Sequence, residues 1–238
     1  MFYKKKATKR SISLRRKVLG VGVNDSEFCT SVYVDGKQIV SPAYSCWMKM
    51  LNRCYSEKYK ELHPSYCGCL VHPDWLKFSV FERWFDNEFS DGMCLDKDLF
   101  GDGSTYSEDN CVFISQRLNS IIRDFYNSRD VEFAHKLKSN GTYQAKCHNG
   151  KKQVHLGTFH REVDAISAYA KEKGRQVELA LVGEPRARVV DRVRFMAGKF
   201  LHKIQSKSLI EQNAELHKEL AKLKAERVFV VNNEEGKK

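Results

Sequence analysis

Two segments of the chain combine many aromatic residues with the spacing of an α-helix. Apolar residues recur three or four positions apart after Pro42, and a second such run begins at Trp75. This spacing places apolar side chains on one face of a helix. Asp74 precedes the second run and is predicted to cap that helix. We predict that the two helices form a core, through Trp47, Met50, Leu51 and Cys54 of the first and Trp75, Phe78, Phe81, Trp84 and Phe85 of the second.

Alternation of apolar and polar residues predicts the strands. Residues 30–40 alternate around Asp35-Gly36, a dipeptide typical of a tight hairpin turn. Residues 92–123 have the pattern of a strand, a loop, a strand and a helix. The fold class predicted is α+β. Three further short strands are expected near 132–138, 142–148 and 153–157, followed by a helix from about Arg161 to Lys173.

The C-terminal segment repeats leucine every seven residues, at Leu209, Leu216 and Leu223. If these are heptad positions d, Asn213 and Leu220 occupy positions a. Leucine at d with a single asparagine at a is typical of a parallel two-stranded coiled coil. The pattern therefore predicts a homodimer through residues 205–227. The alternative is an amphipathic helix that packs on its own domain, because only three heptads are present.

The composition favours a soluble globular chain with 42% hydrophobic and 30% charged residues. No apolar run has the length of a membrane span, and the basic N-terminus lacks the apolar segment of a signal peptide. We therefore expect a cytoplasmic protein with no membrane partner. The eight cysteines, irregularly spaced, are expected to be reduced thiols.

The formal net charge of +11 is unevenly distributed along the chain. The first 20 residues hold eight Lys or Arg and no acid, whereas residues 44–128 hold 9 basic and 13 acidic side chains. This pattern favours a protein that binds a polyanion and carries a separate acidic module. The basic N-terminus is either a solvated tail or an arm that lies along phosphates. The segments expected are an arm with a hairpin at 1–43, then modules at 44–128, 129–183 and 184–238.

Residues 131–182 resemble the AP2 DNA-binding domain over nearly the whole family module. Alternation on the central strand predicts that Ala145 and Cys147 pack on the helix and that Lys146 faces the other way. The motifs that carry the resemblance are Tyr143-Gln-Ala-Lys-Cys-His148, Val154-His-Leu-Gly-Thr-Phe159 and Glu162-Val-Asp-Ala-Ile-Ser-Ala-Tyr169.

In AP2 domains the open face of the sheet enters the major groove of DNA. Lys and Gln side chains can read base edges, and lysines on a turn suit phosphate. Plant members carry Arg and Trp where this chain has His and Gln, so their base preference does not transfer. The chemistry of the turn favours phosphate contacts by Lys151 and Lys152. The resemblance implies DNA contacts by Lys146, His148, Gln153 and His155, and by Lys136 and Lys138 of the first strand.

The preceding module resembles the HNH-like nuclease part of phage-type proteins that combine HNH with AP2. The resemblance rests on Leu95-Asp-Lys-Asp98, Tyr106-Ser-Glu-Asp-Asn-Cys-Val-Phe113 and Asn119. In HNH nucleases a ββα unit holds one divalent metal. A histidine on the first strand activates water, an asparagine orients that histidine, and a final His or Asn on the helix binds the metal. Here Leu95-Asp96 stands where the family has Asp-His.

This resemblance implies Asp96, Asn110 and Asn119 as catalytic residues. It implies Asp96, Asp98 and Asn119 as ligands of Mg²⁺ or another divalent cation, for which oxygen ligands are suited. An unperturbed Asp has a pKa far below neutrality and is a poor general base at neutral pH. The alternative is that Asp96 and Asp98 are turn residues in a module that only supports DNA binding.

Three hypotheses for the function follow. The first is a double-stranded DNA-binding protein of the phage HNH type, a mobile or homing endonuclease in the host cytoplasm, whose AP2 sheet selects the site. The second is a non-catalytic DNA-binding protein or transcriptional regulator built on the same parts. The third is an interaction protein whose coiled coil and basic surface meet RNA or a protein partner.

Overall fold

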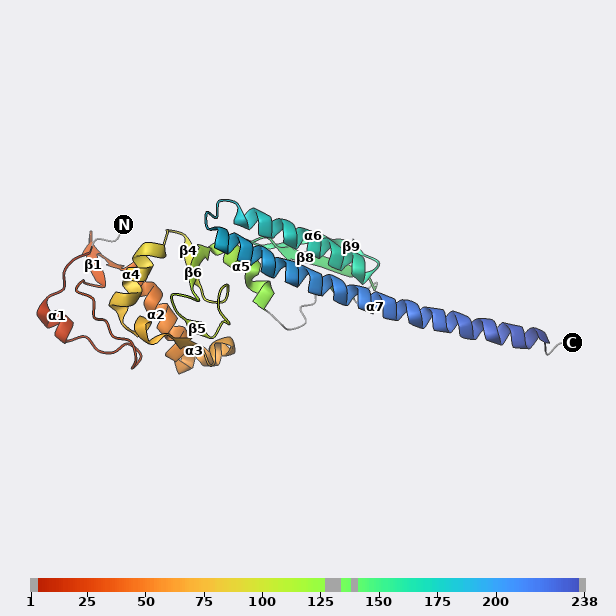
Figure 1. Cartoon of the computed structure of the whole chain (residues 1–238), viewed down its shortest axis with the longest axis horizontal. Coiled ribbons are helices and arrows are strands. Elements are labelled where there is room, and N and C mark those ends of the chain that lie inside the picture. Colours follow the sequence, from red (N-terminus) through yellow and green to blue (C-terminus); the bar gives the residue numbers. More distant parts are fainter. Residues whose placement is uncertain (1–3, 127–133, 138–140, 236–238) are drawn as a thin grey trace. The chain divides into compact units, whose positions relative to one another are not determined.

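The computed structural model describes residues 4–126, 134–137 and 141–235, without the side chains of Lys136 and of 224–235. Helices and small sheets occur together along the chain, so the fold is α+β (Figure 1). The chain forms two compact units, residues 1–119 and 120–238. The N-terminal segment and most of the acidic module belong to the same unit.

The first unit consists of short helices and paired strands, with 3₁₀ turns at Pro64–Tyr66 and Pro73–Leu76. Its elements are α1 (Lys9–Ser13), β1 (Ser31–Val34), β2 (Lys37–Val40), α2 (Pro42–Tyr55), α3 (Glu57–Leu62), β3 (Leu70–Val71), α4 (Phe78–Glu88), β4 (Met93–Asp96), β5 (Thr105–Tyr106) and β6 (Val112–Ser115). Helix α5 (Gln116–Tyr126) begins in this unit and ends in the second.

The aromatic core of the first unit lies between α2 and α4, and both predicted aromatic-rich helices are present. The pattern predicts Trp75 on the second helix, but this residue lies in the 3₁₀ turn Pro73–Leu76, because α4 begins only at Phe78. All nine apolar residues predicted for the core are buried. The indole Nε1 of Trp47 donates a hydrogen bond of 2.7 Å to the carbonyl of Trp75, so the polar atom of this buried ring is satisfied. The ring of Trp75 packs edge-on against Phe81.

The start of α4 differs from the prediction. Asp74 lies in the preceding 3₁₀ turn and does not cap this helix. The first turn of α4 is instead bound by Asp25, whose carboxylate accepts hydrogen bonds of 2.8 Å from the backbone N–H and from the hydroxyl of Ser79. The cap comes from a distant loop because the N-terminal segment folds onto this helix.

From residue 4 onward the basic N-terminal segment is part of the folded unit and not a free tail. The amide of Cys29 donates to the carbonyl of Lys5. Lys4 Nζ lies 2.6 Å from Asp86 on α4. Gly22 sits so close to the core that a Cβ there would lie 2.8 Å from the ring of Trp47. The segment is thus held by backbone bonds, by charge and by packing.

The hairpin predicted at 30–40 and the strand, loop, strand and helix predicted at 92–123 are both present. Strands β1 and β2 are joined by Asp35 and Gly36, which have φ of 51° and 75°, a pair of positive values typical of the tightest hairpin turns. Strands β4 and β6 pair antiparallel up to Asp96 and Val112, and α5 follows β6 directly. The intervening loop includes β5, which pairs parallel with β3.

The second unit is an antiparallel sheet covered by helices. Strands β7 (Ala134–Lys136), β8 (Tyr143–His148) and β9 (Gln153–Phe159) lie in that order. Helix α6 (Glu162–Leu181) packs on the sheet, and the long α7 (Ala187–Glu235) runs alongside α6 (Figure 1). Helix α6 continues past the predicted end at Lys173, because Val177, Ala180 and Leu181 extend its buried face.

The end of α5 is joined to α6 by a buried polar network. Lys173 Nζ donates hydrogen bonds to the carbonyl of Ile121 at 2.6 Å and to Asp124 Oδ2 at 2.7 Å. The hydroxyl of Tyr169 donates to the same carboxylate oxygen at 3.3 Å. The Lys173 side chain is fully buried, so its charge depends on these acceptors.

Candidate nucleic-acid interface

The sheet of the second unit has one packed face and one polar face. Ala145 and Cys147 of β8 are buried on the helix side, as their alternation predicts. Lys146 lies between them on the opposite face and is exposed. It pairs directly with the exposed His155 of β9.

A bulge in β9 keeps the polar residues of that strand on the open face. The register shifts between Ala145 and Lys146, so that Ala145 pairs with Gly157 while Lys146 pairs with His155. Leu156 is the extra residue and packs on the helix side. Gly157 has φ of 142°, a value that L side chains rarely adopt, and a Cβ there would lie 3.1 Å from the ring of Phe159.

The turn between β8 and β9 presents two lysines. Asn149 Oδ1 accepts hydrogen bonds of 2.9 Å from the amides of both Lys151 and Lys152, and both side chains are exposed. His148 Nδ1 accepts from the amide of Gly150 at 3.2 Å, so this histidine also stabilises the turn. The bonds made by Asn149 fix the direction in which the lysines leave the turn.

The structure adds a residue to the face that the sequence reasoning missed. His135 of β7 is exposed and pairs with Gln144, which places both on the same face as Lys146. Lys136 pairs with Tyr143 in the register. The side chain of Lys136 and the whole of Lys138 lie outside the described residues, and their DNA contacts stay predictions.

The charge of this region is uniformly positive. No Asp or Glu occurs between Glu132 and Glu162, a signal present in the sequence that the prediction did not use. Within the described part of the chain, no acidic side chain forms an ion pair with Lys146, Lys151 or Lys152. Their charges are therefore available to an external anion.

The second candidate site is the β4–β6 hairpin with α5, where Asp96 is bound by its own turn. Its carboxylate is buried, and Oδ1 accepts hydrogen bonds from the amides of Asp98 at 2.9 Å and of Leu99 at 2.8 Å. Burial raises the pKa of Asp96 above its ordinary value. These two hydrogen bonds stabilise the turn that follows β4, so the Asp96 carboxylate has a structural role.

Asp98 is paired with a lysine. Lys97 Nζ lies 2.6 Å from Asp98 Oδ1 and also donates to the carbonyl of Gly103. The same ammonium lies 5.7 Å from the centre of the Tyr106 ring. The negative charge of Asp98 is therefore offset within the protein.

The two asparagines of the site have different neighbours. Asn110 Nδ2 donates to the carbonyl of Thr105 at 3.2 Å and stabilises the loop. Asn119 hydrogen-bonds with the thiol of Cys94. Because Cys94 and Asp96 are two residues apart on β4, Asn119 lies on the same side of the hairpin as Asp96. Asn119 and Asp96 are thus brought to one face, while Asn110 is occupied in the loop.

Two of the three residues that the resemblance implies as magnesium ligands are already bound to groups of the protein. Among the residues that the structure describes, no group of three or more His, Cys, Asp or Glu could hold a metal ion. Oδ1 of Asp96 is engaged by two amides, and the Asp98 carboxylate is bound by Lys97.

Comparison with protein-family models, with curated proteins and with solved structures finds no match to this chain. In the described parts of the chain, no helix has both the length and the apolar character needed to cross a membrane. The two candidate sites are therefore judged on their own geometry.

Proposed function

We propose that this protein binds double-stranded DNA through the open face of the β7–β9 sheet. The observation that carries the proposal is the pairing of Lys146 with His155, both exposed, on the face opposite the one that packs on α6. A solvated sheet face needs no particular charge. Residues 133–161 contain no Asp or Glu, and Lys146, Lys151 and Lys152 form no ion pair with any side chain that the structure describes. Such a face suits a polyanion.

The shape and chemistry of the face suit the major groove. That groove is about 12 Å wide and admits a β-ribbon. Lys146 can donate to the acceptors of guanine, and the Gln144 and Gln153 amides can bond with adenine edges. Lys151 and Lys152 at the tip of the turn are placed for phosphates, which position the protein without reading sequence.

The resemblance of residues 131–182 to AP2 domains supports the same proposal, because in that family the corresponding face contacts DNA. The order β4, β6 and α5, with Asn119 on the Asp96 side of the hairpin, is in keeping with the resemblance to HNH modules. The carboxylates of Asp96 and Asp98 in this module are already bound to groups of the protein. The function proposed is therefore DNA binding without cleavage, and the endonuclease is the hypothesis to be tested against it.

The test is a binding assay on the full chain. Duplexes selected from a random pool are titrated by fluorescence anisotropy, because the target sequence is not defined by the fold. We expect the double variant Lys146→Ala/His155→Ala to lose about tenfold or more in affinity at fixed salt.

The matched control removes the same side-chain types from the helices, as Lys171→Ala/His202→Ala, where both residues are exposed. Affinity of the control should stay close to that of the parent. Equal losses in both double variants, or no loss in the first, would exclude the sheet face as the DNA-binding surface.

A further inference from the structure

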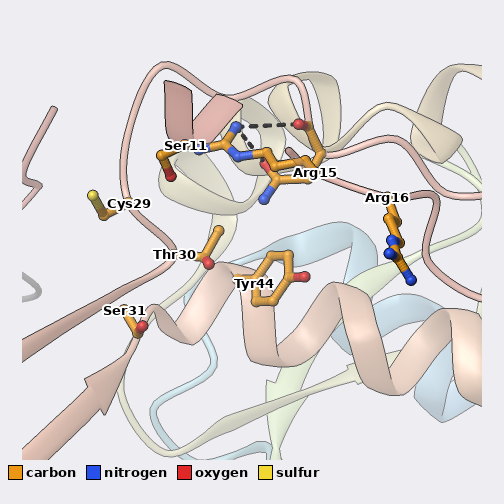
Figure 2. Close-up of a pocket in the computed structure, with 8 residues that line it drawn as sticks. Ser11, Arg15, Arg16, Cys29, Thr30, Ser31 and Tyr44 are labelled. Carbon is orange, nitrogen blue, oxygen red and sulfur yellow. Dashed lines mark hydrogen bonds between the residues drawn. The ribbon is translucent and has the colours of Figure 1, made fainter. Parts of the chain in front are cut away.

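A polar hollow lies in the first unit between the basic N-terminal segment and α2. Its volume is about 440 Å³, and its lining includes Ser11, Arg15, Arg16, Thr30 and Tyr44 (Figure 2). Figure 2 shows Arg15 above Tyr44, with Thr30 on one side and Arg16 on the other. No acidic residue is among those that line it. The hollow therefore joins two guanidinium groups to several hydroxyls.

Arg15 is held in place by neutral acceptors. Its Nη1 donates to the carbonyls of Asn24 at 3.1 Å and of Ser26, and its Nη2 donates to the carbonyl of Phe28 at 2.9 Å. Carbonyl groups orient a guanidinium without cancelling its charge. Asp25 follows Asn24 in the sequence, and its carboxylate accepts hydrogen bonds from Ser79 at the start of α4. The hollow thus contains a fixed positive charge.

The hydroxyl groups supply donors of a second kind. Ser11, Thr30 and Tyr44 each place an O–H group among the lining residues. A tyrosine phenol is protonated at neutral pH and can donate, and burial raises the pKa of Tyr44 further. In Figure 2 the hydroxyl of Tyr44 lies on the side of Arg16. Arg16 is exposed and is one of the residues that line the hollow.

We propose that this hollow binds a phosphate group, specifically a backbone phosphodiester of the DNA. The identification of the source rests on the function proposed above. A phosphate presents several oxygens at once, which matches a set of guanidinium and hydroxyl donors better than a single-point anion does. The eight basic residues and no acid in the first 20 residues favour the approach of a polyanion to this site.

The first experiment uses inorganic phosphate as the probe. Backbone amide signals of the full chain are followed by NMR during titration with phosphate, and in parallel with chloride at equal ionic strength. We expect saturable shifts at Thr30 and Tyr44 with phosphate only. The charge-neutral variants Thr30→Val and Tyr44→Phe should each weaken this binding about three- to tenfold. Shifts that are identical in chloride would overturn the site.

The second experiment measures DNA affinity against salt concentration. If Arg16 contacts one phosphodiester, Arg16→Ala should reduce the slope of log K against log salt by about 0.9. Lys37→Ala, an exposed residue of β2 outside the hollow, is the charge-matched control and should change the slope less. Equal slopes of log K against log salt for the two variants would show that Arg16 attracts DNA only as a general surface charge. That result would overturn the proposed contact.

The two proposals can fail separately. Loss of DNA affinity in the sheet variant, with no effect of Arg16→Ala or Tyr44→Phe, would overturn the phosphodiester site and leave the sheet proposal standing. Saturable phosphate binding by a chain that binds no duplex would support the phosphate hollow and overturn both its assignment to DNA and the proposed function.

Discussion

Lys173 Nζ on α6 lies 2.7 Å from Asp124 Oδ2 near the end of α5, and the lysine is fully buried. The side chain of Asp124 is 26% exposed, so the partner retains some contact with water. This pair, together with the carbonyl of Ile121, joins the end of α5 to the helix that supports the sheet. The position of the helix that packs on the sheet thus depends on a buried lysine, whose charge is offset by Asp124.

Replacing this lysine should destabilise the second unit. Lys173→Met removes the charged partner of Asp124, which keeps the hydroxyl of Tyr169 as a donor. Breaking a buried ion pair in this way costs about 3 to 5 kcal/mol. The partial exposure of Asp124 favours the low end of that range. Urea unfolding measures the loss. The exposed Lys171→Met on the same helix should change stability by no more than about 0.5 kcal/mol, and an equal effect of both variants would contradict a structural role for the pair.

The lysines of the β8–β9 turn should contribute to affinity without contributing to sequence preference. Since phosphate contacts carry no base information, Lys151→Ala/Lys152→Ala should weaken all duplexes alike and reduce the salt slope by about 1.8. Lys146→Ala should instead reduce the ratio between the affinity for the preferred duplex and the affinity for other duplexes. Titrations of matched and mismatched duplexes at several salt concentrations distinguish the two. A change of preference in the turn variant would contradict the assignment.

Two substitutions of Asp96 separate structure from catalysis. Asp96→Asn keeps the Oδ1 oxygen that binds the amides of Asp98 and Leu99, so stability should remain near that of the parent. Asp96→Ala leaves these amides without that acceptor and should lower the free energy of unfolding by about 1 to 3 kcal/mol. Thermal and urea unfolding of the three chains provides the comparison.

The same substitution tests cleavage. We expect no Mg²⁺- or Mn²⁺-dependent nicking of supercoiled plasmid or of duplexes that carry the selected binding site. Metal-dependent cleavage by the parent that Asp96→Asn abolishes, with its fold intact, would contradict the non-catalytic function and establish an endonuclease that uses this carboxylate.

The leucine repeat of α7 should mediate self-association. The heptad residues Leu209, Leu216 and Leu223 are 54%, 54% and 61% exposed in the single chain, so their burial in a second copy would be favourable. We expect a dimer by light scattering that Leu216→Lys converts to a monomer. Ala221→Lys adds the same charge outside the a and d positions and should leave the mass unchanged. A parent chain that is monomeric at all concentrations would exclude the coiled coil.

Periodicity was sufficient for the main helices and for part of the sheet. The residues predicted to form the aromatic core are buried, because a helix with large apolar side chains on one face has few other ways to remove them from water. Alternation likewise placed Ala145 under the helix and Lys146 on the open face. These are local patterns. Because the backbone of a helix or a strand repeats regularly, such a pattern is enough to show which side chains share a face.

The open face could not be completed from the sequence. His135 belongs to it only because β7 pairs with β8 in one register, which the pattern of a three-residue strand does not specify. The bulge at Leu156 also depends on how β9 meets β8. Without that extra residue, strict alternation from His155 would place Thr158 on the packed face of the sheet. With it, Thr158 lies on the open face, opposite Gln144.

The main helices and strands, the excess of positive charge and the candidate side chains could all be inferred from the amino-acid sequence. Three features could be seen only in the folded structure: Asp25 caps α4, Lys173 lies buried beside Asp124, and Asp96 Oδ1 accepts a hydrogen bond from its own turn. The physical reason is the same in each case. Each charged group was assigned its partner by packing between segments or by the path of a loop, and neither is encoded in the repeat of a helix or a strand.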